Sequence, residues 1–236
     1  MIKILLVIPL FIFCNFLYGQ VTLVEYDAIG GGKLSKDELI ITDSISIYNN
    51  NSDNSPSIQE KSFLIKKHLE NRIYMRAGMF NKIFYVADTL HNMKWQLTSE
   101  TKKILNEQCF SATSTFRGRS YIAYYTPGIT NSDGPWKFGG LPGLILEVKS
   151  DDNLFQFVAS KIVKNYSGKV EPVKMDAYKF MDWNEYVYKF IATIDNFAKL
   201  VRSNGSIESG SQASIKIDAP EIIYPKVQQG EGILLQ

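Results

Sequence analysis

The two histidines are the first residues to consider for hydrolytic chemistry, because histidine is the side chain that most often transfers protons in enzymes. His68 follows two lysines and His91 precedes Asn92, so both lie in hydrophilic surroundings. Neither belongs to a Gly-x-Ser-x-Gly turn, a His-Glu-x-x-His helix or another recognisable nucleophile or metal motif. We therefore expect both histidines to face solvent, and the sequence predicts no catalytic residue, no metal site and no cofactor.

A pair of arginines offers a different chemistry. Gly118 allows a tight turn between Arg117 and Arg119, which keeps the two guanidinium groups close to each other. Two such groups can clamp a carboxylate or another anion. The alternative interpretation is a hairpin whose arginines pair internally with acids such as Asp133 or Glu147. Both interpretations remain open at the level of sequence.

A heavily punctuated segment follows these arginines. Glycines and prolines interrupt the chain between residues 134 and 143, and the apolar run Leu144–Val148 comes directly afterwards. We expect at least one of the glycines at 139, 140 and 143 to adopt a positive φ, because three glycines around one proline do not suit a regular strand. The residues assigned to this structural motif are Gly134, Pro135, Gly139, Gly140 and Gly143.

Aromatic residues gather around the same segment. Tyr121, Tyr124 and Tyr125 precede it, and Trp136 and Phe138 lie within it. If one strand ends at Tyr125 and the next begins at Leu144, the connection is long, and long ordered loops are often functional. The alternative is a set of tight turns in which the indole covers the edge of the core. The candidate binding residues are Arg117, Arg119, Tyr125, Asp133, Trp136, Phe138, Leu141 and Pro142.

Short runs rich in Tyr, Phe, Ile and Val predict the elements that must position these residues. They favour a mainly β fold with a curved, mostly antiparallel sheet, shaped as a half-barrel or barrel, since so many strands exceed the usual open sheet. Residues 49–56 are predicted to form an exposed loop. The predicted strands are Val21–Ala28, Leu39–Tyr48, Ser62–Ile65, Arg72–Ala77, Lys82–Asp88, Lys94–Leu97, Cys109–Phe116, Arg119–Tyr125, Gly143–Lys149 and Phe155–Lys164.

The hydrophobic period changes near the C-terminal end. Apolar residues spaced three or four apart predict an amphipathic helix over about 176–203 that packs on the sheet. Its apolar stripe includes Phe180, Trp183 and Ile194, and an interruption near Asp182 is one alternative. After the helix we expect a flexible or extended tail.

The first residues predict export. Lys3 precedes an apolar run that is shorter than the roughly 20 residues a membrane span requires, and Gly19 places a small residue before Gln20. We therefore predict a signal peptide over residues 1–19 and one mature domain over 20–236 without a transmembrane anchor. It would be periplasmic or associated with the outer membrane. Removal of the peptide leaves Cys109 as the one thiol, which we expect to be buried.

Net charge argues against some partners. Lys and Arg total 26 and Asp and Glu total 24, so no basic surplus favours nucleic acid. Three motifs resemble the GLPGLI family of exported proteins of Bacteroidetes type: Phe116–Arg119, Gly134–Phe138 and the hexapeptide Gly140–Ile145. The resemblance covers residues 107–162 specifically. It implies an exported protein of unestablished activity, in some cases associated with outer-membrane receptor systems.

These observations together favour a non-catalytic accessory or binding protein of the bacterial envelope. Its curved sheet would bind a partner protein segment or a small hydrophobic ligand, and the partner would be an envelope protein or one associated with an outer-membrane receptor. The alternative is an envelope enzyme with an unfamiliar active site near Arg117, Arg119 and Asp133.

Overall fold

A single curved sheet dominates the computed structural model, which describes residues 21–50, 63–90, 93–168, 170, 174–203, 214–215, 220–224 and 233–234. Twelve strands form this sheet in the order β12-β6-β5-β4-β3-β2-β1-β11-β10-β9-β8-β7. Its strands are β1 (Thr22–Gly30), β2 (Lys33–Ile41), β3 (Ile45–Asn50), β4 (Phe63–Lys67), β5 (Arg72–Met79), β6 (Lys82–Thr89), β7 (Gln96–Ile104), β8 (Glu107–Phe116), β9 (Arg119–Thr126), β10 (Leu144–Ser150), β11 (Phe155–Lys164) and β12 (Met181–Asp182).

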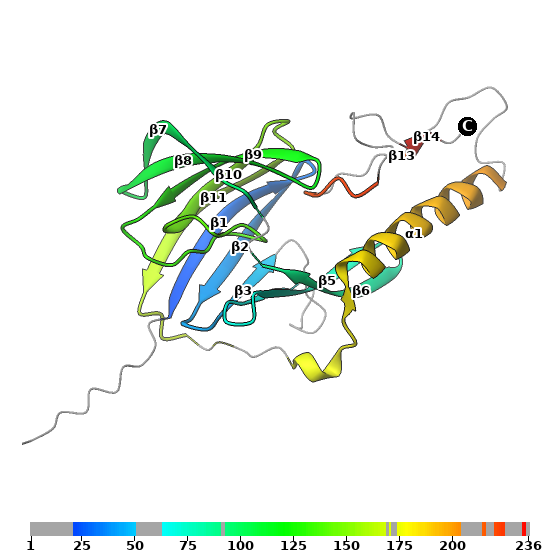
Figure 1. Ribbon diagram of the computed structural model, residues 1–236, viewed down its shortest axis with the longest axis horizontal. Helices are drawn as coiled ribbons and strands as arrows, with labels where there is room; N and C mark the ends of the chain where they lie inside the picture. The colour runs from blue at the N-terminus through cyan, green and yellow to red at the C-terminus, as the bar shows by residue number, and fades with distance from the viewer. Residues whose placement is uncertain are drawn as a thin grey trace, which may run out of the picture.

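Neighbouring strands are antiparallel except for β12, which runs parallel to β6. The sheet remains open but curves strongly, so the predicted class, a mainly β fold with a curved and mostly antiparallel sheet, is confirmed (Figure 1). A separate two-stranded sheet pairs β13 (Ser214–Ile215) with β14 (Ile233–Leu234). No helix in the described ranges is sufficiently long and apolar to cross a membrane.

Tight hairpins set the strand register. Gly31 and Gly32 have φ of 55° and 78° between β1 and β2, and Arg117 and Gly118 have φ of 46° and 83° between β8 and β9. Two successive residues with positive φ form the two-residue turn whose twist matches that of the flanking strands. The predicted turn at Gly118 is therefore present, and it fixes the position of Arg117.

Two strand predictions were wrong. The run Leu39–Tyr48 is divided between β2 and β3, because the chain reverses at Thr42, whose hydroxyl donates to Ile45 O at 2.8 Å. The run Lys94–Leu97 underestimates β7, which is exposed along most of its length and so lacks an apolar alternation. Residues 49 and 50, predicted to lie in a loop, end β3, and residues 51–56 lie outside the described residues.

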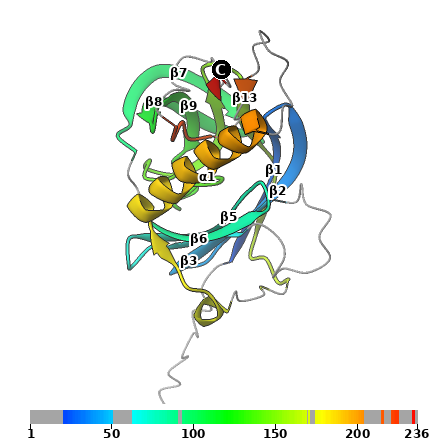
Figure 2. The ribbon, with the colours of Figure 1, turned by 90° about the vertical axis from the view of Figure 1, so that its right-hand side faces the viewer.

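Helix α1 (Trp183–Ser203) lies across one end of the curved sheet (Figures 1 and 2). Tyr186 packs against Phe84 of β6 with ring centroids 5.6 Å apart, and Ile194 is fully buried. The helix begins later than the predicted residue 176, because the Asp182 carboxylate caps it by accepting from Glu185 N at 2.9 Å. The short helix η1 (Met175–Ala177) precedes it.

The sheet has a core on each face. Phe180, predicted to belong to the helix stripe, instead joins Tyr178 and η1 on the convex face, where both rings pack near Tyr85. The larger core fills the concave face and includes Tyr26 and Phe138, both fully buried. Side chains on the concave face are therefore available for a site only where this core leaves space.

Cys109 is fully buried in β8, as expected. Burial raises the pKa of its thiol to about 11, so little of the reactive thiolate forms at neutral pH. We expect a thiol reagent to label the native protein slowly and the denatured protein rapidly, measured by mass spectrometry over time. Rapid labelling of the native protein would contradict this assignment.

Candidate functional site

The connection between β9 and β10, residues 127–143, folds inside the curve of the sheet. It returns to the start of β10 through Leu144 N, which donates to Ile129 O at 3.0 Å, and Ile145 N, which donates to Asp133 O at 2.8 Å. Asp133 also forms an isolated β-bridge with Gly139. The predicted long connection is therefore an ordered loop, which we call the core loop.

Glycines shape the core loop, as expected. Gly140 has a φ of 83° and Gly143 a φ of 145°, both in the region that favours glycine. A Cβ atom on Gly143 would lie 2.1 Å from Thr126 O, and one on Gly134 would lie 2.8 Å from Ile145 Cβ. Trp136, although not a glycine, has a φ of 48°. The backbone of the core loop therefore requires glycine at positions 134, 140 and 143.

Asp133 anchors the core loop to the opposite strands. Its Oδ1 accepts from Lys66 Nζ of β4 at 2.5 Å, and its Oδ2 accepts from the Ser46 hydroxyl of β3. Lys66 also donates to Gly134 O at 2.6 Å and Phe138 O at 2.8 Å. Burial alone would raise the pKa of Asp133, but the Lys66 charge and these hydrogen bonds hold that pKa well below its usual value.

The prediction that His68 simply faces solvent was wrong. His68 Nε2 lies 2.8 Å from Ser46 Oγ and 3.3 Å from Asp133 Oδ2. A catalytic triad places the carboxylate on the ring nitrogen opposite the serine, whereas here one nitrogen faces both groups. Ser46 is also fully buried. This cluster therefore holds the loop in place and does not activate a nucleophile. His91 lies outside the described residues.

Arg117 belongs to a second buried cluster, at the mouth of the curve. It pairs with Asp88 of β6 at 2.7 Å and with Glu221, and Lys137 Nζ of the core loop donates to the same two carboxylates at 3.1 and 2.9 Å. Its guanidinium also stacks 3.4 Å from the Trp183 ring centroid at the start of α1. The cluster therefore joins β6, the β8–β9 turn, the core loop, α1 and residues 220–224.

The predicted internal partners of the arginines were wrong. Asp133 pairs with Lys66, and Glu147 pairs with Lys102 at 2.5 Å. The arginines instead reach other acids: Arg117 pairs with Asp88 and Glu221, and Arg119 pairs with Asp152. The structure therefore places Arg117 and Asp133 in two separate ion-pair clusters.

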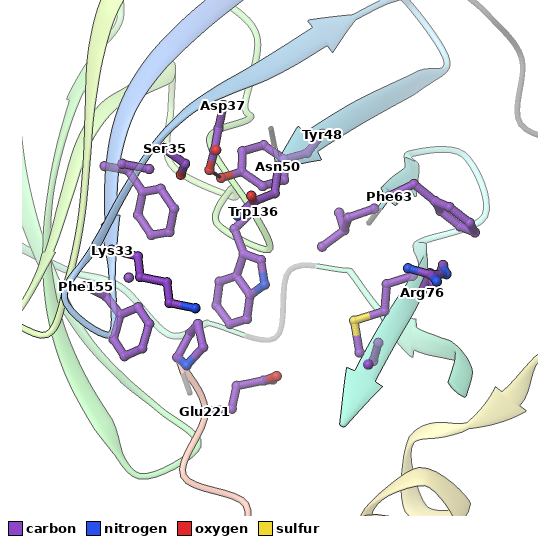
Figure 3. Close-up of a pocket in the computed structure, with 18 of the residues that line it drawn as sticks. Lys33, Ser35, Asp37, Tyr48, Asn50, Phe63, Arg76, Trp136, Phe155 and Glu221 are labelled. Atoms are coloured by element: carbon purple, nitrogen blue, oxygen red, sulfur yellow. Dashed lines mark hydrogen bonds between the residues drawn. The ribbon is translucent and has the colours of Figure 1, made fainter. Parts of the chain in front are cut away.

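A cavity of about 360 Å³ remains at the end of the concave face that is nearest α1. Strands β1–β5 and β11 form its walls, Trp136 enters from the core loop, and Pro220 and Glu221 close one side (Figure 3). Pockets of this size with mainly apolar walls and a few polar groups are typical ligand sites. The aromatic side chains that line it are Tyr48, Trp136, Phe155, Phe157 and Tyr186. Phe63 also borders the cavity, but its ring packs on Tyr178 on the convex face.

Polar groups enter the cavity from β2. Lys33, Ser35 and Asp37 alternate along this strand, so they share its concave face. Asp37 is fully buried and accepts a hydrogen bond from the Tyr48 hydroxyl. Burial and the nearby Asp37 charge raise the pKa of Tyr48 well above its usual value. The Lys33 side chain reaches from the strand toward Trp136 (Figure 3).

Of the predicted binding residues, Trp136 alone lines this cavity. Phe138 and Leu141 are buried in the core, Tyr125 is buried on β9, and Pro142 is exposed. The cavity residues of β1–β5 and β11 were not among the predicted binding residues. Alternation on β2 was the available signal, but polar residues at every second position equally describe a solvent-facing side. Among the residues that the structure describes, no group of three or more His, Cys, Asp or Glu side chains could hold a metal ion.

The fold and the cavity together define an open curved β-sheet with a ligand-sized space on its concave face. A family described as "Protein of unknown function (Porph_ging)" has a model that matches residues 117–147. The matched segment runs from the β8–β9 turn through β9 and the core loop into β10, so it includes both Arg117 and Trp136. No curated protein matches the chain.

Three comparisons with solved structures differ in their extent of similarity. PNGF-II in space group P21 is similar with a TM-score of 0.53 and 18% identity, covering 71% of this chain and 32% of that one. PNGF-II in space group C2 has a TM-score of 0.49 and 18% identity, covering 72% of this chain and 32% of that one. The Pseudomonas aeruginosa MucA/MucB complex has a TM-score of 0.35 and 9% identity, covering 68% of this chain and 56% of that one. This chain thus spans about a third of PNGF-II, and the first similarity shows a shared fold alone.

Proposed function

We propose that the protein is a non-catalytic, exported binding protein of the bacterial envelope, and that the concave cavity binds a small hydrophobic ligand. The observation that carries this proposal is the aromatic cavity of about 360 Å³ between the core loop and β1–β5. Apolar surface that leaves water on binding supplies the affinity, and the few polar groups supply orientation.

The two buried ion-pair clusters favour binding over catalysis. The carboxylates of Asp133, Asp88 and Glu221 all accept from lysine or arginine, so their charges already stabilise the fold. An enzyme site near Arg117, Arg119 and Asp133 would require groups that converge on one cleft. In this structure Arg117 and Asp133 belong to different clusters. Neither arginine lines the cavity, although Arg117 pairs with the lining residue Glu221 and Arg119 lies against the ring of Phe155.

The boundaries of the cavity favour a small ligand over a partner segment. A bound segment requires an extended groove or a free sheet edge, whereas this space is bounded by Glu221 on one side and by Trp136 on another. We further propose that the chain is a GLPGLI family protein, because the hexapeptide Gly140–Ile145 lies in the matched segment. A partner, if the ligand is handed on, would be an envelope protein or one associated with an outer-membrane receptor.

Native mass spectrometry of protein purified from the periplasm tests export and binding together. We expect a chain that begins at or near Gln20 and carries a non-covalent adduct of small mass, which is lost when the protein is unfolded. A chain that retains Met1 would contradict export. An unliganded mass, unchanged after incubation with an organic extract of the envelope, would contradict ligand binding.

A further inference from the structure

The polar groups of the cavity include two buried acids and several accessible donors. Glu221 accepts from Lys137 at 2.9 Å and also from Arg117, and Asp37 accepts from Tyr48. Both acids are buried: Glu221 is 7% exposed and Asp37 is 0% exposed. A ligand that enters the cavity therefore meets carboxylates that are either neutralised or covered.

The donors are in the opposite situation. Within the part of the chain that the structure describes, Lys33 Nζ, Ser35 Oγ and Trp136 Nε1 make no hydrogen bond or ion pair. Lys33 is exposed and Ser35 and Trp136 are half-buried, so all three can be reached. Lys33 and Ser35 lie two residues apart on one face of β2, and the Lys33 side chain extends toward Trp136 (Figure 3).

Charge then decides which ligand fits. An ammonium group at the mouth would meet the Lys33 charge and could not reach the covered Asp37 carboxylate. A carboxylate would accept from Lys33 with a charge-assisted hydrogen bond, which is roughly twice as strong as a neutral one. Ser35 could satisfy a second carboxylate oxygen. The apolar part of the same ligand would then lie between Phe155 and Trp136, away from water.

We infer that the ligand is a small amphipathic acid, whose carboxylate is held by Lys33 at the mouth and whose apolar body fills the aromatic cavity. This inference rests on the proposed function, because it names the chemical class of ligand for the same site. Aromatic and aliphatic acids share this chemistry, and the experiment distinguishes them.

Calorimetric titration at pH 7 with two matched pairs of probes tests the inference. The aromatic pair is 2-naphthylacetate and 2-naphthylacetamide, and the aliphatic pair is decanoate and 1-decanol. We expect at least one acid to bind the wild-type protein about tenfold or more tightly than its neutral analogue. Lys33→Met should abolish that preference without weakening the neutral analogue, and Lys33→Arg should keep it.

Lys36→Met is the matched control, since Lys36 lies on the same strand, points to the other face and pairs with Asp27 at 2.7 Å. It should leave the preference unchanged. Equal affinity for acid and neutral analogue, or a preference that survives Lys33→Met, would overturn the inference while leaving a binding cavity. If no probe of either pair bound, both the inference and the proposed function would be overturned.

Discussion

Replacing Lys66 with methionine is expected to lower the free energy of unfolding by about 3–5 kcal/mol, because it leaves the Asp133 carboxylate buried without its cation. Lys66 and Asp133 have side chains that are 1% and 2% exposed and lie 2.5 Å apart. The substitution also removes the donor to Gly134 O and Phe138 O. Urea denaturation followed by circular dichroism measures the effect.

The double variant Lys66→Met, Asp133→Leu is the informative control, because replacing a buried pair with apolar residues costs less than breaking it.

The Lys66–Asp133 pair also predicts that stability depends on pH. Asp133 has a lowered pKa in the folded state. Its ionised form therefore contributes to the free energy of unfolding above its unfolded pKa of about 3.9, and this contribution is lost as pH falls further. Wild-type stability should therefore decline more steeply than that of the double variant below about pH 4. Parallel declines would contradict this account.

Gly143→Ala is expected to cost about 3 kcal/mol or more, because strain and a backbone clash act together. The new Cβ would lie 2.1 Å from Thr126 O and 2.9 Å from Pro127 Cα, atoms that belong to the main chain and cannot rotate away. Gly143 also has a φ of 145°. The readout is the midpoint of chemical denaturation.

Two other glycines separate strain from clash. Gly32 has a φ of 78° but no atom within 4 Å of its added Cβ, so Gly32→Ala should show the strain alone, about 1 kcal/mol. Gly78 has open space and an ordinary φ, so Gly78→Ala should change stability little. If Gly143→Ala were no more damaging than Gly32→Ala, the steric role of Gly143 would be refuted.

The fold was largely predictable from the sequence, because runs of β-branched and aromatic residues bounded by turns indicate most of the strands. β7 was underestimated, since an exposed edge strand needs no apolar alternation. The start of α1 was misplaced because Phe180 continues the helical spacing but packs on the convex face. The capping contact at Asp182 sets the start of the helix, and it depends on local geometry that the spacing does not reveal.

The site was less predictable, because its residues meet only after the sheet curves. The punctuated loop was identified, and Gly140 and Gly143 have the expected positive φ. The partner of Asp133, in contrast, lies 67 residues away on β4, and no local spacing distinguishes that lysine from the others. The polar alternation of β2 describes a solvent-facing side equally well until the concave face is known.

The measurement that tests the central claim most directly compares two serine-to-phenylalanine variants by native mass spectrometry. Ser35 lines the cavity, whereas Ser99 is exposed on β7. Ser35→Phe should fill the space and abolish the small-molecule adduct of the protein purified from the periplasm, and Ser99→Phe should retain it, with both variants folded by circular dichroism. An adduct that persists in Ser35→Phe, or that both variants lose equally, would contradict a ligand site in the cavity.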